Sequence, residues 1–175
     1  MKRGIDYIGN SVVYFCHDGK GNFVMAKRSA NARDEHGKWD IGGGGLEFGE
    51  KVEDCLRKEI KEEYMADVLG YEFLGFRDVH REKEGVRTHW IALDFKVLVD
   101  REEVRIGEPE KFDEIGWFTI DNLQDKNIAI KEGSDALKGS DPEDRRDNRR
   151  GANLPDNMHS QLPVFFEKYQ NELKS

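Results

Sequence analysis

The pattern of apolar positions divides the chain into strand-like and helix-like segments. Runs rich in Val, Ile, Tyr and Phe predict β-strands at Tyr7–His17, Phe23–Ser29, Trp39–Ile41, Tyr71–Val79, Thr88–Val99 and Glu114–Thr119. Helical spacing predicts two helices, one from Lys51 to about Asp67 and one at Ser160–Leu173 with Leu162, Phe165, Phe166 and Tyr169 on its inner face. This order predicts an α/β sandwich in which helices flank a mixed sheet.

Turns and loops separate these segments. Asp18–Asn22 is rich in turn residues and joins the first two strands as a hairpin, and the charged stretch Arg81–Gly85 joins two later strands. The glycines of Gly42–Gly45 are expected to interrupt regular structure. Residues 131–151 contain no aromatic residue and interleave acidic, basic and glycine residues. We therefore expect an exposed insertion loop within a single domain spanning residues 1–175.

The composition narrows the choice of partners and compartment. A net charge of −8, with 37% charged residues, argues against binding long nucleic acid or an anionic membrane, since both need a basic surface. No apolar run approaches the ~18 residues of a membrane span. Cys16 and Cys55 are the only cysteines and lie far apart in the sequence, which indicates a reduced, cytoplasmic setting. Whether the chain forms a homodimer is left open.

Three glutamates lie on an unexpected side of the first predicted helix. Counting 100° per residue places the apolar residues of this helix in one sector, and Glu59, Glu62 and Glu63 project into the same sector. Carboxylates buried together repel one another and are costly to desolvate. A divalent cation would remove both costs, and Mg²⁺ prefers hard oxygen ligands. Ion pairs with Lys or Arg from elsewhere in the fold are the alternative.

The four glycines directly before this helix strengthen the case for a metal. Glycine can adopt positive φ and lets the backbone approach a ligand closely. A backbone carbonyl in Gly42–Gly45 could therefore add a metal ligand. A flexible loop would explain the glycines alone, but their position before an acidic helix is more specific.

These residues resemble the Nudix box of Nudix hydrolases, with the pattern G-x5-E-x7-R-E-U-x-E-E-x-G-U, where U is a bulky aliphatic residue. The match runs from Gly44 to Ala66 and contains Glu50, Lys58-Glu59-Ile60 and Glu62-Glu63. Three positions depart from the pattern: Lys58 replaces Arg, Met65 replaces Gly, and Ala66 replaces the aliphatic residue. Lysine keeps the charge but loses the bidentate fork, and the change at Met65 predicts an altered helix exit.

The resemblance implies an α/β/α sandwich that hydrolyses a nucleoside diphosphate linked to a further group X. It implies Glu59, Glu62, Glu63 and the Gly44 carbonyl as ligands of Mg²⁺, for which Mn²⁺ could substitute. Glu59, Glu62 or a carboxylate on a later loop would orient the attacking water, and Glu110 is the candidate on that loop. A solvated loop acid is the alternative for Glu110.

The substrate is less closely defined. The segment Glu108–Lys111 ahead of Trp117-Phe118 is similar to MutT-like members, which convert nucleoside triphosphates to monophosphates and pyrophosphate. Members acting on ADP-ribose tend to carry a proline after the box, and none occurs from Asp67 to Glu108. An ADP-ribose or nucleotide-sugar pyrophosphatase is therefore the alternative enzyme. A non-catalytic Nudix-fold nucleotide sensor is the alternative from another class.

Basic and aromatic residues near the glycines are candidates for binding the nucleotide. Lys27, Arg28 and Arg33 could contact phosphates in this otherwise acidic protein. A salt bridge is the competing role for Arg28. Trp39 could stack on a base, but a tryptophan on a strand more often packs in the core.

Overall fold

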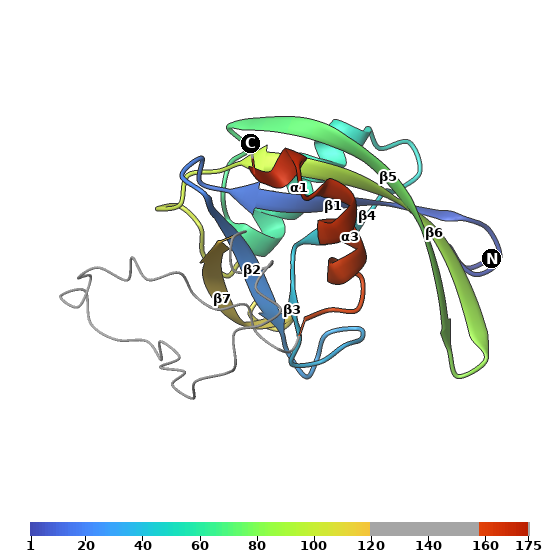
Figure 1. The fold of residues 1–175 in the computed structure, drawn as a ribbon. Helices are drawn as coiled ribbons and strands as arrows, with labels where there is room; N and C mark the ends of the chain where they lie inside the picture. The colour runs from blue at the N-terminus through green and yellow to red at the C-terminus, as the bar shows by residue number, and fades with distance from the viewer. Residues whose placement is uncertain (120–157, 175) are drawn as a thin grey trace.

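The computed structural model describes residues 1–119 and 158–174, so the insertion expected at 131–151 lies outside the described residues. Its strands (Figure 1) are β1 (Gly9–His17), β2 (Asn22–Arg28), β3 (Trp39–Asp40), β4 (Gly43–Gly45), β5 (Gly70–Lys83), β6 (Val86–Leu98) and β7 (Phe112–Thr119). The helices are α1 (Val52–Tyr64), α3 (Leu162–Tyr169) and the short 3₁₀ helix η1 (Glu172–Lys174).

The strands form one mixed sheet with the order β3-β2-β1-β6-β5, to which β4 adds beside β1 and β7 adds beside β2. β1 and β6 run parallel, from the pair Gly9 and Trp90 to the pair His17 and Leu98. The remaining pairs are antiparallel. The predicted mixed sheet is therefore confirmed.

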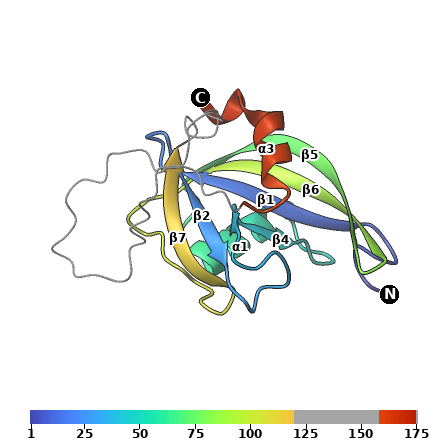
Figure 2. The same cartoon turned by 60° about the horizontal axis from the view of Figure 1, so that its bottom comes forward.

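Helices cover both faces of this sheet (Figure 2). Successive side chains of a strand point to opposite faces, so each strand can contribute apolar residues to both helix contacts. On β1, Val12 and Tyr14 pack into the apolar cluster that contains the inner face of α1. Phe15 faces the other way and packs with Phe165 and Phe166 of α3. The predicted inner face of the last helix is buried as expected. The α/β/α arrangement follows from these two apolar clusters.

Two expectations about the turns were wrong. Gly43–Gly45 do not interrupt regular structure, because they form β4 and pair antiparallel with β1. Strands β5 and β6 also extend further than the predicted turn Arg81–Gly85 allows. The chain reverses at Glu84 and Gly85, whose φ angles of 53° and 77° suit a two-residue hairpin turn. Residues expected in the turn therefore pair as strand.

Helix α1 ends at Tyr64, before the predicted Asp67, because Met65 has a left-handed φ of 56°. The amide of Met65 still bonds to the Lys61 carbonyl at 3.1 Å. The next free helix carbonyls accept backbone bonds from a distant segment, with Arg105 N on Tyr64 O at 2.9 Å and Gly107 N on Glu63 O at 3.0 Å. The helix exit thus keeps the conformation that glycine favours, with methionine in its place.

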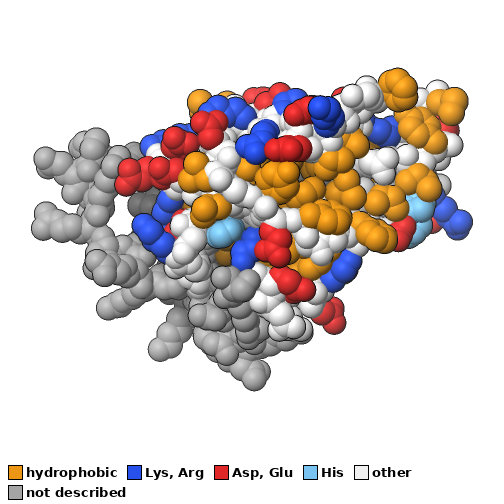
Figure 3. Space-filling view, turned by 90° about the horizontal axis from the view of Figure 1, so that it is seen from above, with side chains coloured by type: hydrophobic (Ala, Val, Ile, Leu, Met, Phe, Trp, Pro, Cys, Tyr) orange, Lys and Arg blue, Asp and Glu red, His pale blue; other side chains and the backbone are white. Residues whose placement is uncertain are grey.

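Exposed apolar side chains gather on one face, seen from above in Figure 3. Tyr71, Phe73 and Phe76 of the edge strand β5 are among the large hydrophobic residues that remain exposed. Both cysteines are buried and free. Among residues 1–119 and 158–174, no helix has the length and apolar character needed to cross a membrane.

Candidate active site

The carboxylate of Glu63 is held in the sheet-facing side of α1. Its side chain is only 6% exposed. One oxygen, Oε2, accepts hydrogen bonds from the Tyr14 hydroxyl at 2.5 Å and from the Gly43 amide at 3.3 Å. Both donors are neutral, so neither offsets the charge of the carboxylate. Burial, together with the charges of Glu59 and Asp40, raises the pKa of Glu63 to about 8.

Glu59 lies one turn before Glu63 and is half-buried. Lys58 Nζ stands 2.7 Å from Glu50 Oε1 and 3.5 Å from Glu59 Oε1, so the lysine joins two acids of the box. Burial raises the pKa of Glu59, and the nearby charge of Glu62 raises it further. The ion-pair alternative therefore accounts for part of the charge on Glu59, through Lys58, but within residues 1–119 and 158–174 no ion pair is formed by Glu63.

Glu62 differs from the other two glutamates because its side chain is exposed. The expectation that all three point to the buried side was therefore wrong for Glu62. At 100° per residue Glu62 falls at the margin of the apolar sector, where a side chain can reach solvent. The exposed position leaves this carboxylate accessible to a bound molecule.

The glycines before α1 permit close packing against these acids. A Cβ atom on Gly44 would stand 1.9 Å from Glu59 Cδ, and one on Gly42 would stand 2.5 Å from Glu63 Oε2 and 2.0 Å from a ring carbon of Tyr14. A larger side chain at either position would therefore have to displace its neighbour. Neither has a positive φ. The glycines are needed for close approach, while the expected left-handed backbone is absent.

The segment after β6 passes over the end of α1. Gly107 packs so closely that a Cβ there would stand 1.9 Å from the Glu62 carbonyl. Lys111 Nζ pairs with Glu108 at 2.6 Å. Partial burial lowers the pKa of Lys111, but Glu108 and the charges of Glu63 and Glu59 raise it overall. Lys111 is thus a cation within electrostatic range of the acid cluster, although its ion-pair partner is Glu108.

Glu110, the expected loop carboxylate, has an exposed side chain. Its backbone carbonyl accepts a 2.6 Å hydrogen bond from Ser29 Oγ. That bond fixes the main chain of the loop and leaves the carboxylate accessible. A catalytic role for Glu110 stays a prediction.

The basic residues of the β2 region are engaged with acids. Arg28 is 15% exposed and pairs with Asp34 at 2.7 Å and Asp40 at 3.4 Å, which is the salt-bridge alternative. Lys27 lies 3.7 Å from Glu114. Arg33 is 76% exposed and lies 3.5 Å from Asp34. The structure does not bring these three cations onto the glutamates, so their contact with phosphate stays a prediction.

Trp39 packs at the edge of the apolar cluster around α3. Its ring meets Phe118 edge-on, with centroids 5.1 Å apart, and lies beside Gly116. Its backbone carbonyl accepts a bond from His159 N at 2.8 Å. These contacts give Trp39 a packing role, and stacking on a base stays untested.

Two residues of the site were missed by sequence reasoning. Tyr14 alternates onto the α1 face of β1, but its partner Glu63 lies 49 residues away in the chain. Lys111 belongs to the segment that resembles MutT-like members, although only Glu110 was selected from it. The strand pattern could have placed Tyr14 on the correct face, whereas its bond to Glu63 needed the tertiary fold.

The arrangement fits a divalent cation. Glu63 is a buried carboxylate bonded by neutral donors, and Glu59 is held against Gly44 where any Cβ would collide. All ligand atoms are hard oxygens of the kind that Mg²⁺ and Mn²⁺ prefer. A cation bound beside Glu59, Glu62 and Glu63 would offset the charge that the neutral donors leave on the buried acid.

Comparison with known proteins shows which family the chain resembles. The sequence profile of the NUDIX domain matches residues 8–137. The chain is 31% identical over 120 residues to "Nucleoside triphosphatase NudI" of Enterobacter sp. (strain 638). The aligned residues cover 63% of this chain and 84% of the relative. The protein of the same name from Escherichia coli (strain K12 / DH10B) is 32% identical over 120 residues, which are 63% of this chain and 84% of that protein.

Two solved structures share the fold. One is the MutT NUDIX hydrolase from Burkholderia pseudomallei, with a TM-score of 0.66 and 20% identity over 93% of this chain and 98% of that one. The other is the MutT protein from Methanosarcina mazei Go1, with a TM-score of 0.65 and 20% identity over 96% of each chain. The chain belongs to the Nudix family and is a Nudix hydrolase. The resemblance stated from the box residues is confirmed.

Proposed function

We infer that the chain is a Mg²⁺-dependent pyrophosphohydrolase that converts a nucleoside triphosphate to the monophosphate and pyrophosphate. The observation that carries this inference is the acid cluster of α1, with Glu63 buried, Glu59 packed on Gly44 and Glu62 open to solvent. The relatives named nucleoside triphosphatase support the substrate class. Mn²⁺ is expected to substitute for Mg²⁺, since both take oxygen ligands.

The side chains of the site have different expected roles, which follow from how deeply each is buried. Glu63, fixed by Tyr14 and Gly43, and Glu59, fixed by Lys58 and Gly44, would hold the cation together with Glu62 and the Gly44 carbonyl. A bound Mg²⁺ neutralises phosphate charge and lowers the pKa of a bound water. Because these ligands lie on a helix and a strand, their positions relative to the reacting phosphate are fixed.

Hydrolysis also needs a group that accepts a proton. The water oxygen forms a bond to phosphorus, the bridging P–O bond breaks, and the proton of the water passes to a carboxylate. Glu62 is exposed beside the half-buried Glu59, so Glu62 or Glu59 can orient the water, and Glu110 on the neighbouring loop is the third candidate. Lys111 lies within electrostatic range of these acids and can attract the polyphosphate.

A nucleotide panel with product analysis tests the function. Chromatography should show monophosphate and pyrophosphate from at least one triphosphate in the presence of Mg²⁺. Chelation should abolish turnover, and added Mg²⁺ or Mn²⁺ should restore it. Glu62→Gln should lower kcat by about 100-fold or more, the size expected when a general base is removed, and Glu63→Gln should cause a comparable loss because it removes a ligand of the cation.

Glu53→Gln is the matched control. Glu53 lies on the same helix, is exposed, and pairs with Arg57 at 3.0 Å on the solvent side. This variant should keep wild-type turnover, because an exposed pair of this kind contributes only ~0.3–0.5 kcal/mol to stability. Full turnover in both Glu62→Gln and Glu63→Gln would overturn the assigned roles. Hydrolysis of ADP-ribose, with no hydrolysis of any triphosphate in the panel, would overturn the substrate class.

A further inference from the structure

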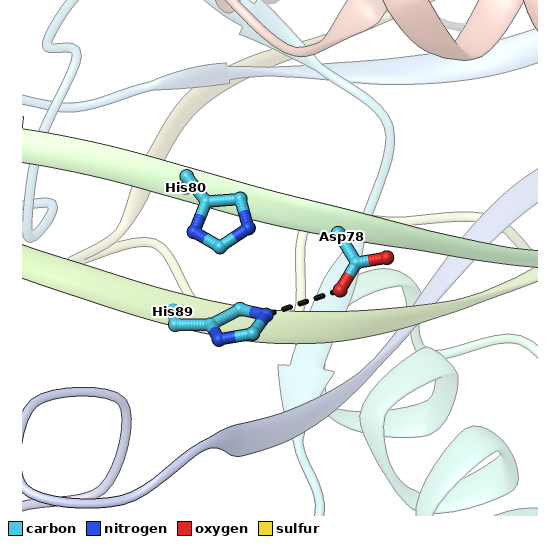
Figure 4. A group of neighbouring side chains, drawn as sticks. All are labelled: Asp78, His80 and His89. Carbon is cyan, nitrogen blue, oxygen red and sulfur yellow. Dashed lines mark hydrogen bonds and ion pairs between the residues drawn. The ribbon is translucent and has the colours of Figure 1, made fainter.

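Three side chains able to bind a metal gather on the β5–β6 hairpin, near its turn and outside the acid cluster of α1 (Figure 4). They are Asp78 and His80 of β5 and His89 of β6. One ligand atom from each lies within 4.8 Å of the others. His89 Nε2 stands 3.0 Å from Asp78 Oδ1. The two imidazole rings are stacked with centroids 4.1 Å apart. We call this group the hairpin triad.

The strand register explains why these side chains converge. His80 and His89 are direct cross-strand partners in the antiparallel pair. Asp78 stands two residues before His80, so its side chain projects from the same face, diagonal to His89. Strand pairing therefore sets the relative positions of all three ligands before any ion binds. A site built on two paired strands is more rigid than one built on a loop.

The surroundings leave the triad accessible. Asp78 is 53% exposed and His89 is 34% exposed at the side chain. The next carboxylate toward the turn, Glu82, is paired with Arg87 at 3.2 Å. The main-chain amide of His89 is anchored to the Gly4 carbonyl at 2.8 Å. The ligand side chains can rotate while the strands that carry them stay in place.

The donor set indicates the class of ion. Two imidazole nitrogens and one carboxylate oxygen suit borderline transition ions such as Zn²⁺, whereas Mg²⁺ prefers oxygen alone. Zn–N bonds are about 2.0–2.1 Å long, so small rotations of the exposed side chains would close the triad around an ion. We propose that Asp78, His80 and His89 form a Zn²⁺-class site that joins β5 to β6, separate from the acid cluster.

A simple ion pair between Asp78 and His89 is the competing explanation. Such a pair already satisfies the 3.0 Å contact and gives His80 no role. A metal site needs His80 as a ligand. Replacing His80 therefore separates the two, because it removes a metal ligand and leaves the pair intact.

Calorimetric titration with Zn²⁺ tests the proposal on the full chain. The acid cluster will also take Zn²⁺, so the measured quantity is the difference between variants that share that cluster. Wild type should bind one more equivalent than His80→Ala, or bind it at least about tenfold more tightly, a loss typical even of residues that only support a ligand. His89→Gln removes a different ligand at similar size and should show the same loss.

Glu82→Gln is the matched control, since it removes a carboxylate from the same face beyond the triad. It should titrate like wild type. NMR of the histidine rings supplies a local readout, in which Zn²⁺ should shift the His80 and His89 resonances together. Equal titration of wild type and His80→Ala, or an equal loss in Glu82→Gln, would overturn the site. Zn²⁺ binding is measured without any nucleotide, so the result stands apart from the proposed hydrolysis.

Discussion

Substituting Gly44 by alanine should separate catalysis from folding. A Cβ at this position would stand 1.9 Å from Glu59 Cδ and 2.1 Å from Glu59 Oε2, whereas ordinary contact begins at 3.4 Å. The Glu59 carboxylate must therefore move by about 1.5 Å to restore ordinary contact, which exceeds the ~1 Å misplacement that already impairs a catalytic group. The atoms in the way belong to the end of a flexible side chain, so the backbone can stay in place.

The two effects have different sizes. A displacement of ~1 Å can reduce catalysis by about 100-fold, so kcat of Gly44→Ala should fall by about that factor or more. Forcing Glu59 into a poorer rotamer costs only ~0.5–1.5 kcal/mol. For a chain of this length that corresponds to a decrease in Tm of a few degrees, at about 2–4 °C per kcal/mol. The variant should be folded and nearly inactive.

Steady-state kinetics with the best nucleotide of the panel and a thermal melt measure the two quantities. Gly43→Ala is the control from the same strand, because a Cβ there would stand 3.0 Å from Val12 O, which requires a shift of only a few tenths of an ångström, and the alanine amide can still donate to Glu63. It should retain most activity. The reasoning is refuted if folded Gly44→Ala turns over at the wild-type rate, or if Gly43→Ala loses as much.

Two further predictions concern stability. Partial burial raises the pKa of Glu35, but hydrogen bonds from Ser160 outweigh it and lower the pKa from 4.5 to about 2; the stabilisation is present above pH 4.5 and is lost as the pH falls towards 2. Because Glu35 is partly solvated, Glu35→Gln should lose only ~1 kcal/mol in urea unfolding at about pH 7 and less at about pH 3, and an equal loss at both would contradict the assignment. Met65→Gly should raise the free energy of unfolding by about 1 kcal/mol. Removing the left-handed strain of a residue with a Cβ stabilises the fold by ~1–2 kcal/mol, and the larger loss of chain entropy at glycine cancels ~0.5–1 kcal/mol of that. An unchanged or lower Tm in Met65→Gly would show that Met65 is unstrained.

Local pattern predicted most of the fold. The 3.6-residue period located α1 and the apolar face of α3, and runs rich in Val, Ile, Tyr and Phe located the strands other than β4. The ends of elements were less predictable because they depend on single backbone conformations. Met65 ends α1 through its left-handed φ, and Glu84-Gly85 shortens the hairpin turn through two positive φ values. Neither Met nor Glu favours this conformation, so the sequence carried little signal.

The amino-acid sequence by itself determined the family and the acid cluster. Glu59, Glu62 and Glu63 are brought together by helical spacing, which is local and therefore readable from the chain. Tertiary structure decided how each acid is used, since burial and hydrogen bonding depend on what packs against the helix. Tyr14 and Gly43 reach Glu63 from separate strands, while Glu62 stays in solvent.

The same distinction holds for the glycines and for the hairpin triad. The sequence showed that small residues precede the acidic helix, but only the fold showed that Gly42 and Gly44 make room for Tyr14, Glu63 and Glu59. His80 and His89 are nine positions apart and share no local motif. The register of β5 against β6 makes them neighbours, because the two-residue turn at Glu84 and Gly85 fixes which residues of the hairpin pair, and the sequence predicted a longer turn there.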